Sequence, residues 1–184
     1  MKNTQKKLKT KHFRYLSKEY AKNPNLFLKE VVYQWGIDWS THINYFINSC
    51  IYPPMRTKHF FEYGFIHVHL GQMIEMGYVV MIQCNWKPVP KSEVFQYRCT
   101  EIFTAEIEDN IVFPSIILRD FFSFKTLQEW YKVLDELQLS RDLTIANSKE
   151  VHFGIDYIPV RELLVKLPKA LLEIHNRGGL QRFL

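Results

Sequence analysis

Two histidines separated by one residue, His67 and His69, are the pair in this sequence that best suits a metal ion. If the segment is a β-strand, both imidazoles project from one face and could share a divalent transition metal such as zinc or iron. If it is an α-helix, the two side chains lie about 200° apart and cannot chelate one ion. The hypothesis of a metal-dependent enzyme using His67 and His69 therefore depends on the local secondary structure.

A catalytic zinc site usually has about three protein ligands, so a third would have to come from elsewhere in the chain. The candidates are His42, His59, Glu75 and His152. The sequence contains no P-loop, dinucleotide-binding, nucleophile-elbow or zinc-protease motif, and only 7 of its 184 residues are glycine. Phosphate-binding loops rely on backbone conformations that glycine favours. We therefore predict no nucleotide cofactor, and a divalent transition metal is the only cofactor left open.

Positive charge is concentrated at the N-terminus. Residues 1–18 contain seven basic residues and no acidic one, whereas the rest of the chain has 17 basic and 19 acidic residues. A nearly neutral body offers no basic groove, so any attraction to nucleic-acid phosphates would come from the N-terminal segment. Its candidate contacts are Lys6, Lys7, Lys9, Lys11 and Arg14. The alternative is a solvated terminus without a ligand. We predict a basic, flexible arm over residues 1–11 and a single domain over residues 12–184.

Length and composition indicate one soluble domain. A chain of 184 residues, 47% of them apolar, can bury one hydrophobic core. The most apolar stretch, residues 60–83, is interrupted by two glutamates and two histidines. The N-terminus lacks the apolar region of a secretory signal, and the three cysteines form no C-x-x-C pair. We therefore predict a cytoplasmic protein that does not contact a membrane.

Aromatic residues make up 15% of the chain, and one of them is placed to contact a partner. Trp86 follows a predicted strand at the start of a proline-containing connection, where an exposed indole could anchor another protein. The leading hypothesis is a binding or regulatory module that engages an unidentified protein partner or forms a homodimer. The alternatives are a nucleic-acid-associated protein that uses residues 1–18 and the metal-dependent enzyme described above.

Helical periodicity dominates the first third of the chain. Residues 11–21 form one predicted helix, and Pro24 begins a second that Gly36 ends. Asp38 or Ser40 can cap a third helix. Its predicted buried face is Ile43, Phe46, Ile47 and Cys50.

The middle of the chain favours strands. Residues 60–77 are apolar on every face at helical pitch, whereas residues 65–70 alternate in polarity, so helix and strand compete there. The first half slightly favours a helix, and the rest stays open. Residues 78–84 are rich in β-branched and aromatic side chains, and residues 94–100 alternate in polarity. Residues 111–118 form a third apolar run, in which Pro114 indicates an edge or bulged strand. We therefore predict a small, mainly antiparallel sheet.

The C-terminal part returns to helical patterning. Thr126 and Glu129 have the spacing of a capping box. A helical stripe follows it, formed by Leu127, Trp130, Leu134 and Leu137. Pro159 can begin a last helix, which Pro168 would kink or split and the two glycines at 178–179 would end. The predicted fold class is therefore α+β, with a helical N-terminal third, a small antiparallel sheet in the middle and a helical C-terminal part packed on it.

Overall fold

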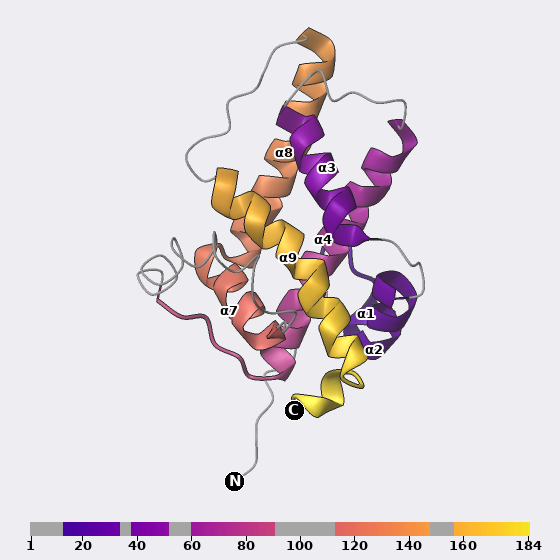
Figure 1. The fold of residues 1–184 in the computed structure, drawn as a ribbon, viewed down its shortest axis with the longest axis vertical. Helices are drawn as coiled ribbons and strands as arrows, with labels where there is room; N and C mark the ends of the chain where they lie inside the picture. The colour runs from indigo at the N-terminus through magenta and orange to yellow at the C-terminus, as the bar shows by residue number, and fades with distance from the viewer. Residues whose placement is uncertain (1–12, 34–37, 52–59, 91–112, 148–156) are drawn as a thin grey trace.

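Helices are the only regular secondary structure in the residues that the computed structural model describes, which are 13–33, 38–51, 60–90, 113–147 and 157–184. The α-helices are α1 (Lys18–Lys22), α2 (Pro24–Phe27), α3 (Trp39–Ile51), α4 (Phe60–Gln83), α7 (Pro114–Phe124), α8 (Leu127–Asn147) and α9 (Tyr157–Asn176) (Figure 1). A π-helical segment, η2 (Leu28–Tyr33), follows α2, and a short 3-10 helix, η4 (Leu180–Arg182), follows α9. The predicted α+β class is therefore wrong for these residues, which are all helical.

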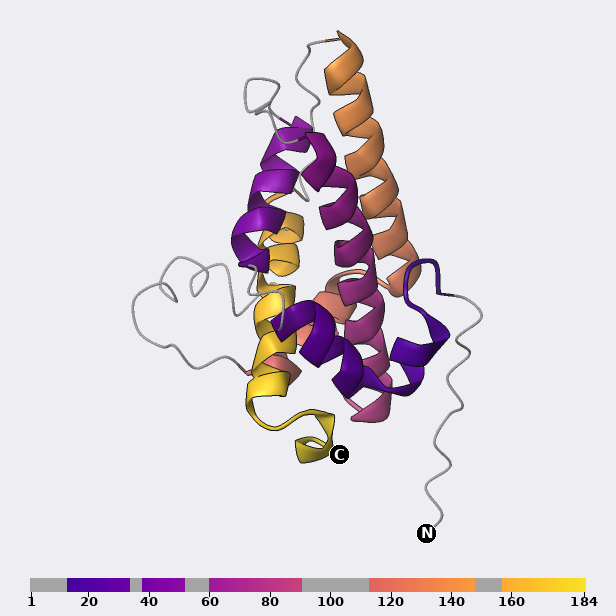
Figure 2. The same cartoon turned by 90° about the vertical axis from the view of Figure 1, so that its right-hand side faces the viewer.

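Helix α4 is the central element of the bundle. It packs against α1, α2, α3, α7, α8 and α9 (Figure 2). Six of its apolar side chains have no exposed surface, namely Leu70, Met73, Ile74, Met76, Val79 and Val80. A helix surrounded by other helices is apolar on every face, which explains why the sequence of residues 60–77 showed no single polar face. The predicted strand at 78–84 is wrong, since α4 continues to Gln83.

Within the described part of the chain, one helical window has the length and composition to cross a bilayer. It spans Gly64–Gln83, and 67% of it is buried inside the fold. A helix at the centre of a bundle needs the same apolar composition as a membrane span, because it contacts other helices in all directions. Hydropathy therefore does not distinguish a membrane span from a core helix here.

The third predicted strand is also helical where it is described. Phe113 is the N-cap of α7, residues 114–118 form the first part of the helix, and Pro114 occupies the first turn. Proline is compatible with that position because its missing N–H would have no partner in the helix. Leu118, Phe121 and Phe122 then recur at helical spacing and are buried. The predicted strand at 94–100 lies outside the described residues.

The C-terminal helix predictions are largely confirmed. The backbone N–H of Thr126 donates to Glu129 Oε2 at 2.7 Å and that of Glu129 to Thr126 Oγ1 at 3.3 Å, which is the reciprocal pattern of a capping box. Helix α9 begins at Tyr157, two residues before the predicted start at Pro159, and it continues through Pro168 to Asn176, so the predicted split does not occur. Gly178 and Gly179 follow with positive φ angles of 96° and 90°, and glycine adopts such angles without steric strain.

Three hydrogen bonds cross the contact between α3 and α9, and their partners recur every four residues on both helices. They join Ser40 Oγ to Val165 O at 2.9 Å, Arg161 Nε to Asn44 Oδ1 at 2.7 Å, and the Tyr157 hydroxyl to Asn48 Oδ1 at 2.9 Å. The residue numbers rise along α3 as they fall along α9, so the helices are antiparallel. A displacement by one turn would break all three bonds and leave the group at one end of the ladder without its partner, so the ladder favours this register.

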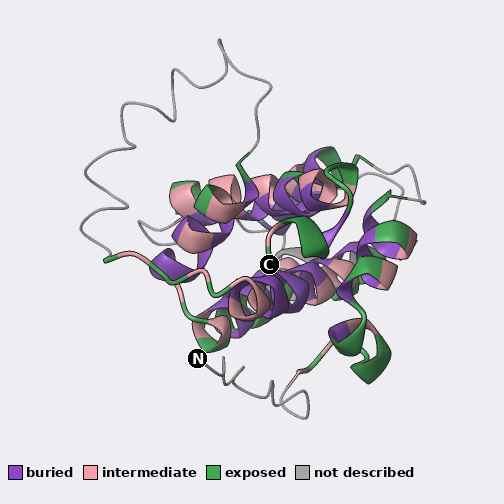
Figure 3. Ribbon diagram, turned by 90° about the horizontal axis from the view of Figure 1, so that it is seen from below, coloured by how far each residue is buried: buried purple, intermediate pink, exposed green. Residues whose placement is uncertain are grey.

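The core lies between these helices, and the predicted apolar face of α3 is confirmed. Its residues Ile43, Phe46, Ile47 and Cys50 are at most 1% exposed. Asp38 caps α3, because its Oδ1 accepts the backbone N–H of Thr41 at 3.2 Å. Figure 3 shows the buried residues on the facing sides of the helices and the exposed ones on the outside.

The N-terminal helix is shorter than the sequence predicts. Residues 11–21 have helical spacing, yet α1 covers only Lys18–Lys22, with Ser17 as its N-cap. The preceding described residues, 13–17, are not helical. The backbone N–H groups of residues 14–16 donate to a side chain of α4 and so have hydrogen-bond partners without a helix.

Candidate functional site

Glu75 lies in the middle of α4 and has no exposed surface. A carboxylate is rarely buried without partners, because removal of its charge from water costs several kcal/mol. From the sequence, the only role predicted for Glu75 was that of a metal ligand. Its position within a 24-residue apolar helix was nevertheless a signal that another part of the chain must provide hydrogen-bond donors.

Those donors come from three consecutive backbone N–H groups. Arg14 N lies 2.6 Å from Glu75 Oε1, while Tyr15 N and Leu16 N lie 3.0 and 2.5 Å from Oε2. The hydroxyl of Tyr131, on α8, donates to Oε1. Successive backbone N–H groups of this kind form a concave site for an anion. We call Glu75, the backbone of residues 14–16 and the Tyr131 hydroxyl the Glu75 clamp.

The clamp occupies the hydrogen-bonding capacity of Glu75. An ionised carboxylate has about four lone-pair positions, and the four donors of the clamp occupy them. Burial, together with the hydrogen bond to Glu75, raises the pKa of Tyr131, so its phenol keeps the proton that it donates. The arrangement therefore anchors the N-terminal segment to α4 and α8.

Side chains of the same segment complete its attachment. Nη1 of Arg14 lies 3.0 and 3.2 Å from the two carboxylate oxygens of Asp135 on α8, and the guanidinium lies 4.4 Å from the centre of the Tyr131 ring. The ring of Tyr15 packs on Gly71, where a Cβ atom would come within 2.5 Å of it. Glycine at position 71 therefore makes room for Tyr15 against α4.

The two histidines of the metal hypothesis do not lie together. Both are on α4, so the strand geometry that would let them share an ion is absent. His67 contacts the Tyr15 ring edge-on at 5.7 Å between centroids, whereas His69 packs on Trp39 and Phe65 at 5.5 and 4.2 Å. Burial lowers the pKa of both imidazoles.

The proposed third ligands do not complete a site in the described part of the chain. Glu75 is engaged in the clamp, and His42 is exposed with Nδ1 2.8 Å from Asp38 O. His59 and His152 lie outside the described residues. No group of three His, Cys, Asp or Glu residues that could hold a metal occurs among the residues described.

Of the predicted nucleic-acid contacts, only Arg14 lies in the described part of the chain. The others lie outside it, namely Lys6, Lys7, Lys9 and Lys11. Trp86 is partly buried and packs edge-on against Phe183, with 5.7 Å between ring centroids. Part of its indole is therefore used within the chain.

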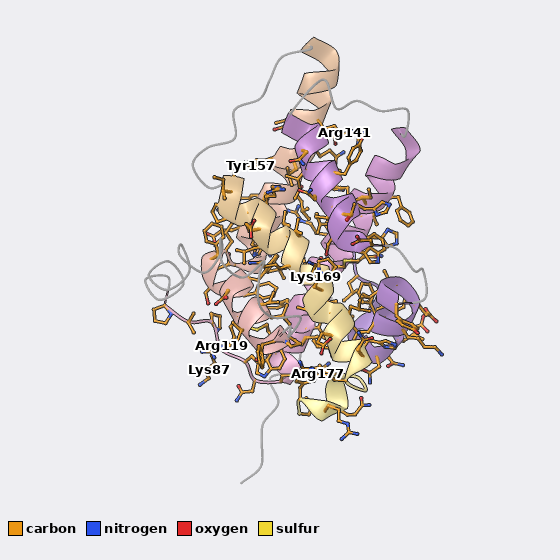
Figure 4. The ribbon with its side chains drawn as sticks, in the orientation of Figure 1. Lys87, Arg119, Arg141, Tyr157, Lys169 and Arg177 are labelled. Carbon is orange, nitrogen blue, oxygen red and sulfur yellow. The ribbon has the colours of Figure 1, made fainter. Side chains whose placement is uncertain are left out.

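Basic side chains of the helical body are spread over its surface. Figure 4 shows Lys87 and Arg119 near α7, Lys169 on α9, Arg177 just after its C-terminal end, and Arg141 on α8. The Nε atom of Arg119 donates to Lys87 O at 3.0 Å, and Arg177 Nε lies 2.7 Å from Glu173 Oε1. This distribution agrees with the nearly neutral composition of the chain beyond residue 18.

A second surface feature combines aromatic residues of α3 and α4. The rings of Trp39 and Phe65 are nearly parallel, with 5.9 Å between centroids and an interplanar angle of 10°. His69 packs against both of them, as given above. Phe65 is 39% exposed, and Val68, one turn along α4, is 41% exposed. We call Trp39, Phe65 and His69 the Phe65 stack.

In the described part of the chain the regular secondary structure is all helical, and a central helix anchors an N-terminal segment through a buried carboxylate. No protein-family profile, curated protein or solved structure matches the chain significantly. Its function therefore has to be inferred from the two sites themselves.

Proposed function

We propose that this chain is a protein-binding module and that the Phe65 stack is its contact surface. The observation that supports this proposal is the exposure of Phe65 at one side of a ring cluster that is held in place. Trp39 Nε1 donates to Val31 O at 3.1 Å, and His69 Nδ1 lies 2.8 Å from Phe65 O. Because these contacts restrict the rings before binding, a partner loses less conformational entropy when it packs on Phe65.

Substitution of Phe65 should weaken association by about 30-fold or more, since a hot-spot aromatic residue at the centre of an interface contributes about 2 kcal/mol or more. The first measurement is light scattering over a range of protein concentrations, which detects self-association. The second is the affinity for any protein that the wild type retains in a pull-down, compared between wild type and Phe65→Ala.

Ile116→Ala is the matched control for Phe65→Ala. Ile116 lies on α7 and has the same exposed fraction, 39%. Circular dichroism should show that both variants remain helical. Equal effects of the two substitutions, or a wild type that stays monomeric and retains no protein, would contradict the proposed contact surface.

A second candidate function is the binding of nucleic-acid phosphates by the N-terminal arm. The clamp favours it, because residues 14–16 are fixed on the body and the Arg14 side chain beside them is 46% exposed. Phosphate contacts by Arg14 and by the lysines that precede it in the sequence would add up to one affinity, because each neutralised phosphate releases counterions.

Deletion of residues 1–11 tests this candidate, because it removes five lysines. If all five contact phosphates, the slope of log affinity against log salt for duplex DNA should become shallower by about 4.5. Fluorescence anisotropy with a 20-base-pair duplex over a salt series measures that slope. Absence of binding by the full chain at low salt, or an unchanged slope after the deletion, would exclude an arm that binds nucleic acid.

A further inference from the structure

We propose that Asp135 is a built-in competitor of nucleic acid for Arg14. In the free protein Asp135 occupies the Arg14 guanidinium, and a nucleic-acid phosphate takes its place when the arm binds. This inference rests on the arm function proposed above. It adds a specific residue on the helical body that reduces the affinity of the arm.

In the ion pair between Arg14 and Asp135, another anion can replace the carboxylate. Both side chains are exposed, at 46% and 56%, and their closest atoms lie 3.0 Å apart. Exposed ion pairs contribute little to stability because water and salt screen them. A phosphate is a good replacement for the carboxylate, since guanidinium donors match the geometry of both groups.

The backbone of Arg14 is held separately from its side chain. The N–H group of Arg14 donates to the buried Glu75, whereas the guanidinium uses Nη1 towards Asp135. The side chain can therefore exchange one anion for another while residues 14–16 stay in the clamp. The ring of Tyr131, 4.4 Å from the guanidinium carbon, supports the cation in either state.

The carboxylate opposes phosphate binding in two ways. It occupies donors of the guanidinium, and its negative charge repels a phosphate that approaches the remaining donors. Replacement of Asp135 by asparagine removes the charge with almost no change in shape. We expect Asp135→Asn to bind duplex DNA about two- to fivefold more tightly than the wild type, which is the range that loss of one exposed ion pair allows.

Glu136→Gln provides the matched control. Glu136 is the next residue on α8, is exposed, and its substitution changes the net charge by the same amount. A general electrostatic effect would raise the affinity of both variants equally. The proposed competition raises it more for Asp135→Asn, while the salt slope should stay near that of the wild type, because a phosphate contacts Arg14 in both complexes.

Arg14→Gln identifies the group through which Asp135 acts. In this background Asp135→Asn and Glu136→Gln should have the same affinity for the 20-base-pair duplex, since the guanidinium is no longer present. Anisotropy titrations of the full-length variants at several salt concentrations give these comparisons. A wild type that binds no duplex at low salt would overturn the arm function and the competition with it. Measurable binding, with equal affinities for Asp135→Asn and Glu136→Gln, would overturn the competition alone.

Discussion

Glu75→Gln is expected to lower the free energy of unfolding by about 3 kcal/mol. The amide keeps one oxygen acceptor but places an NH2 group against the backbone N–H groups of residues 14–16, which are themselves donors. At least one of these buried donors then loses its partner. Urea denaturation followed by circular dichroism measures the change in unfolding free energy.

Hydrogen exchange locates the effect of the same substitution. In the wild type the amides of Arg14, Tyr15 and Leu16 should exchange slowly although they lie outside any helix, because Glu75 accepts all three. In Glu75→Gln they should exchange rapidly while amides of α8 remain protected. Glu136→Gln, an exposed carboxylate change, should alter stability by no more than about 0.5 kcal/mol. Similar stabilities of the two variants would show that the clamp contributes nothing.

Trp130→Ala is expected to cost about 4 kcal/mol, the typical loss for a fully buried aromatic residue. Trp130 has no exposed surface, stacks on Phe121 with 4.1 Å between ring centroids, and donates from Nε1 to Phe121 O at 3.1 Å. The indole therefore joins α7 to α8 through both packing and a hydrogen bond. Thermal and urea unfolding should show the loss directly.

Two further variants separate these contributions of Trp130. Trp130→Phe retains a ring that can stack on Phe121 and should recover part of the stability, but not the hydrogen bond. Leu139→Ala removes a side chain of the same helix that is 58% exposed, and should change stability by no more than about 0.5 kcal/mol. A loss below about 1 kcal/mol for Trp130→Ala would contradict its role in joining the helices.

Short-range signals explain the predictions that were confirmed. The capping box at Thr126 and Glu129 joins residues three positions apart, and the buried face of α3 follows from residues within two helical turns. Such patterns depend on backbone geometry within one element. They could be recognised in the sequence without knowledge of the neighbouring helices.

The clamp could not be derived in the same way. Glu75 and the three amides that it accepts are separated by 59 to 61 positions in the chain. A buried charge indicates that donors must exist, but any segment with unpaired amides can supply them. The helical spacing of residues 11–21 even predicted that these amides were already used. The exchangeable pair of Arg14 with Asp135, 121 positions apart, is likewise visible only after folding.

The sequence by itself determined the N-cap of α8, the apolar face of α3, the glycine pair after α9 and the separation of basic charge from the body. For α3 it left two possible N-caps, Asp38 and Ser40. Only the tertiary structure decided between helix and strand at residues 78–83 and 114–118, and only it brought residues 14–16 to Glu75. The physical reason is one of magnitude. The helix propensities of ordinary residues differ by less than about 0.7 kcal/mol, whereas full burial of one large apolar side chain contributes about 1.5 to 3 kcal/mol. Where local preferences are weak, the helices that pack around a segment determine its conformation.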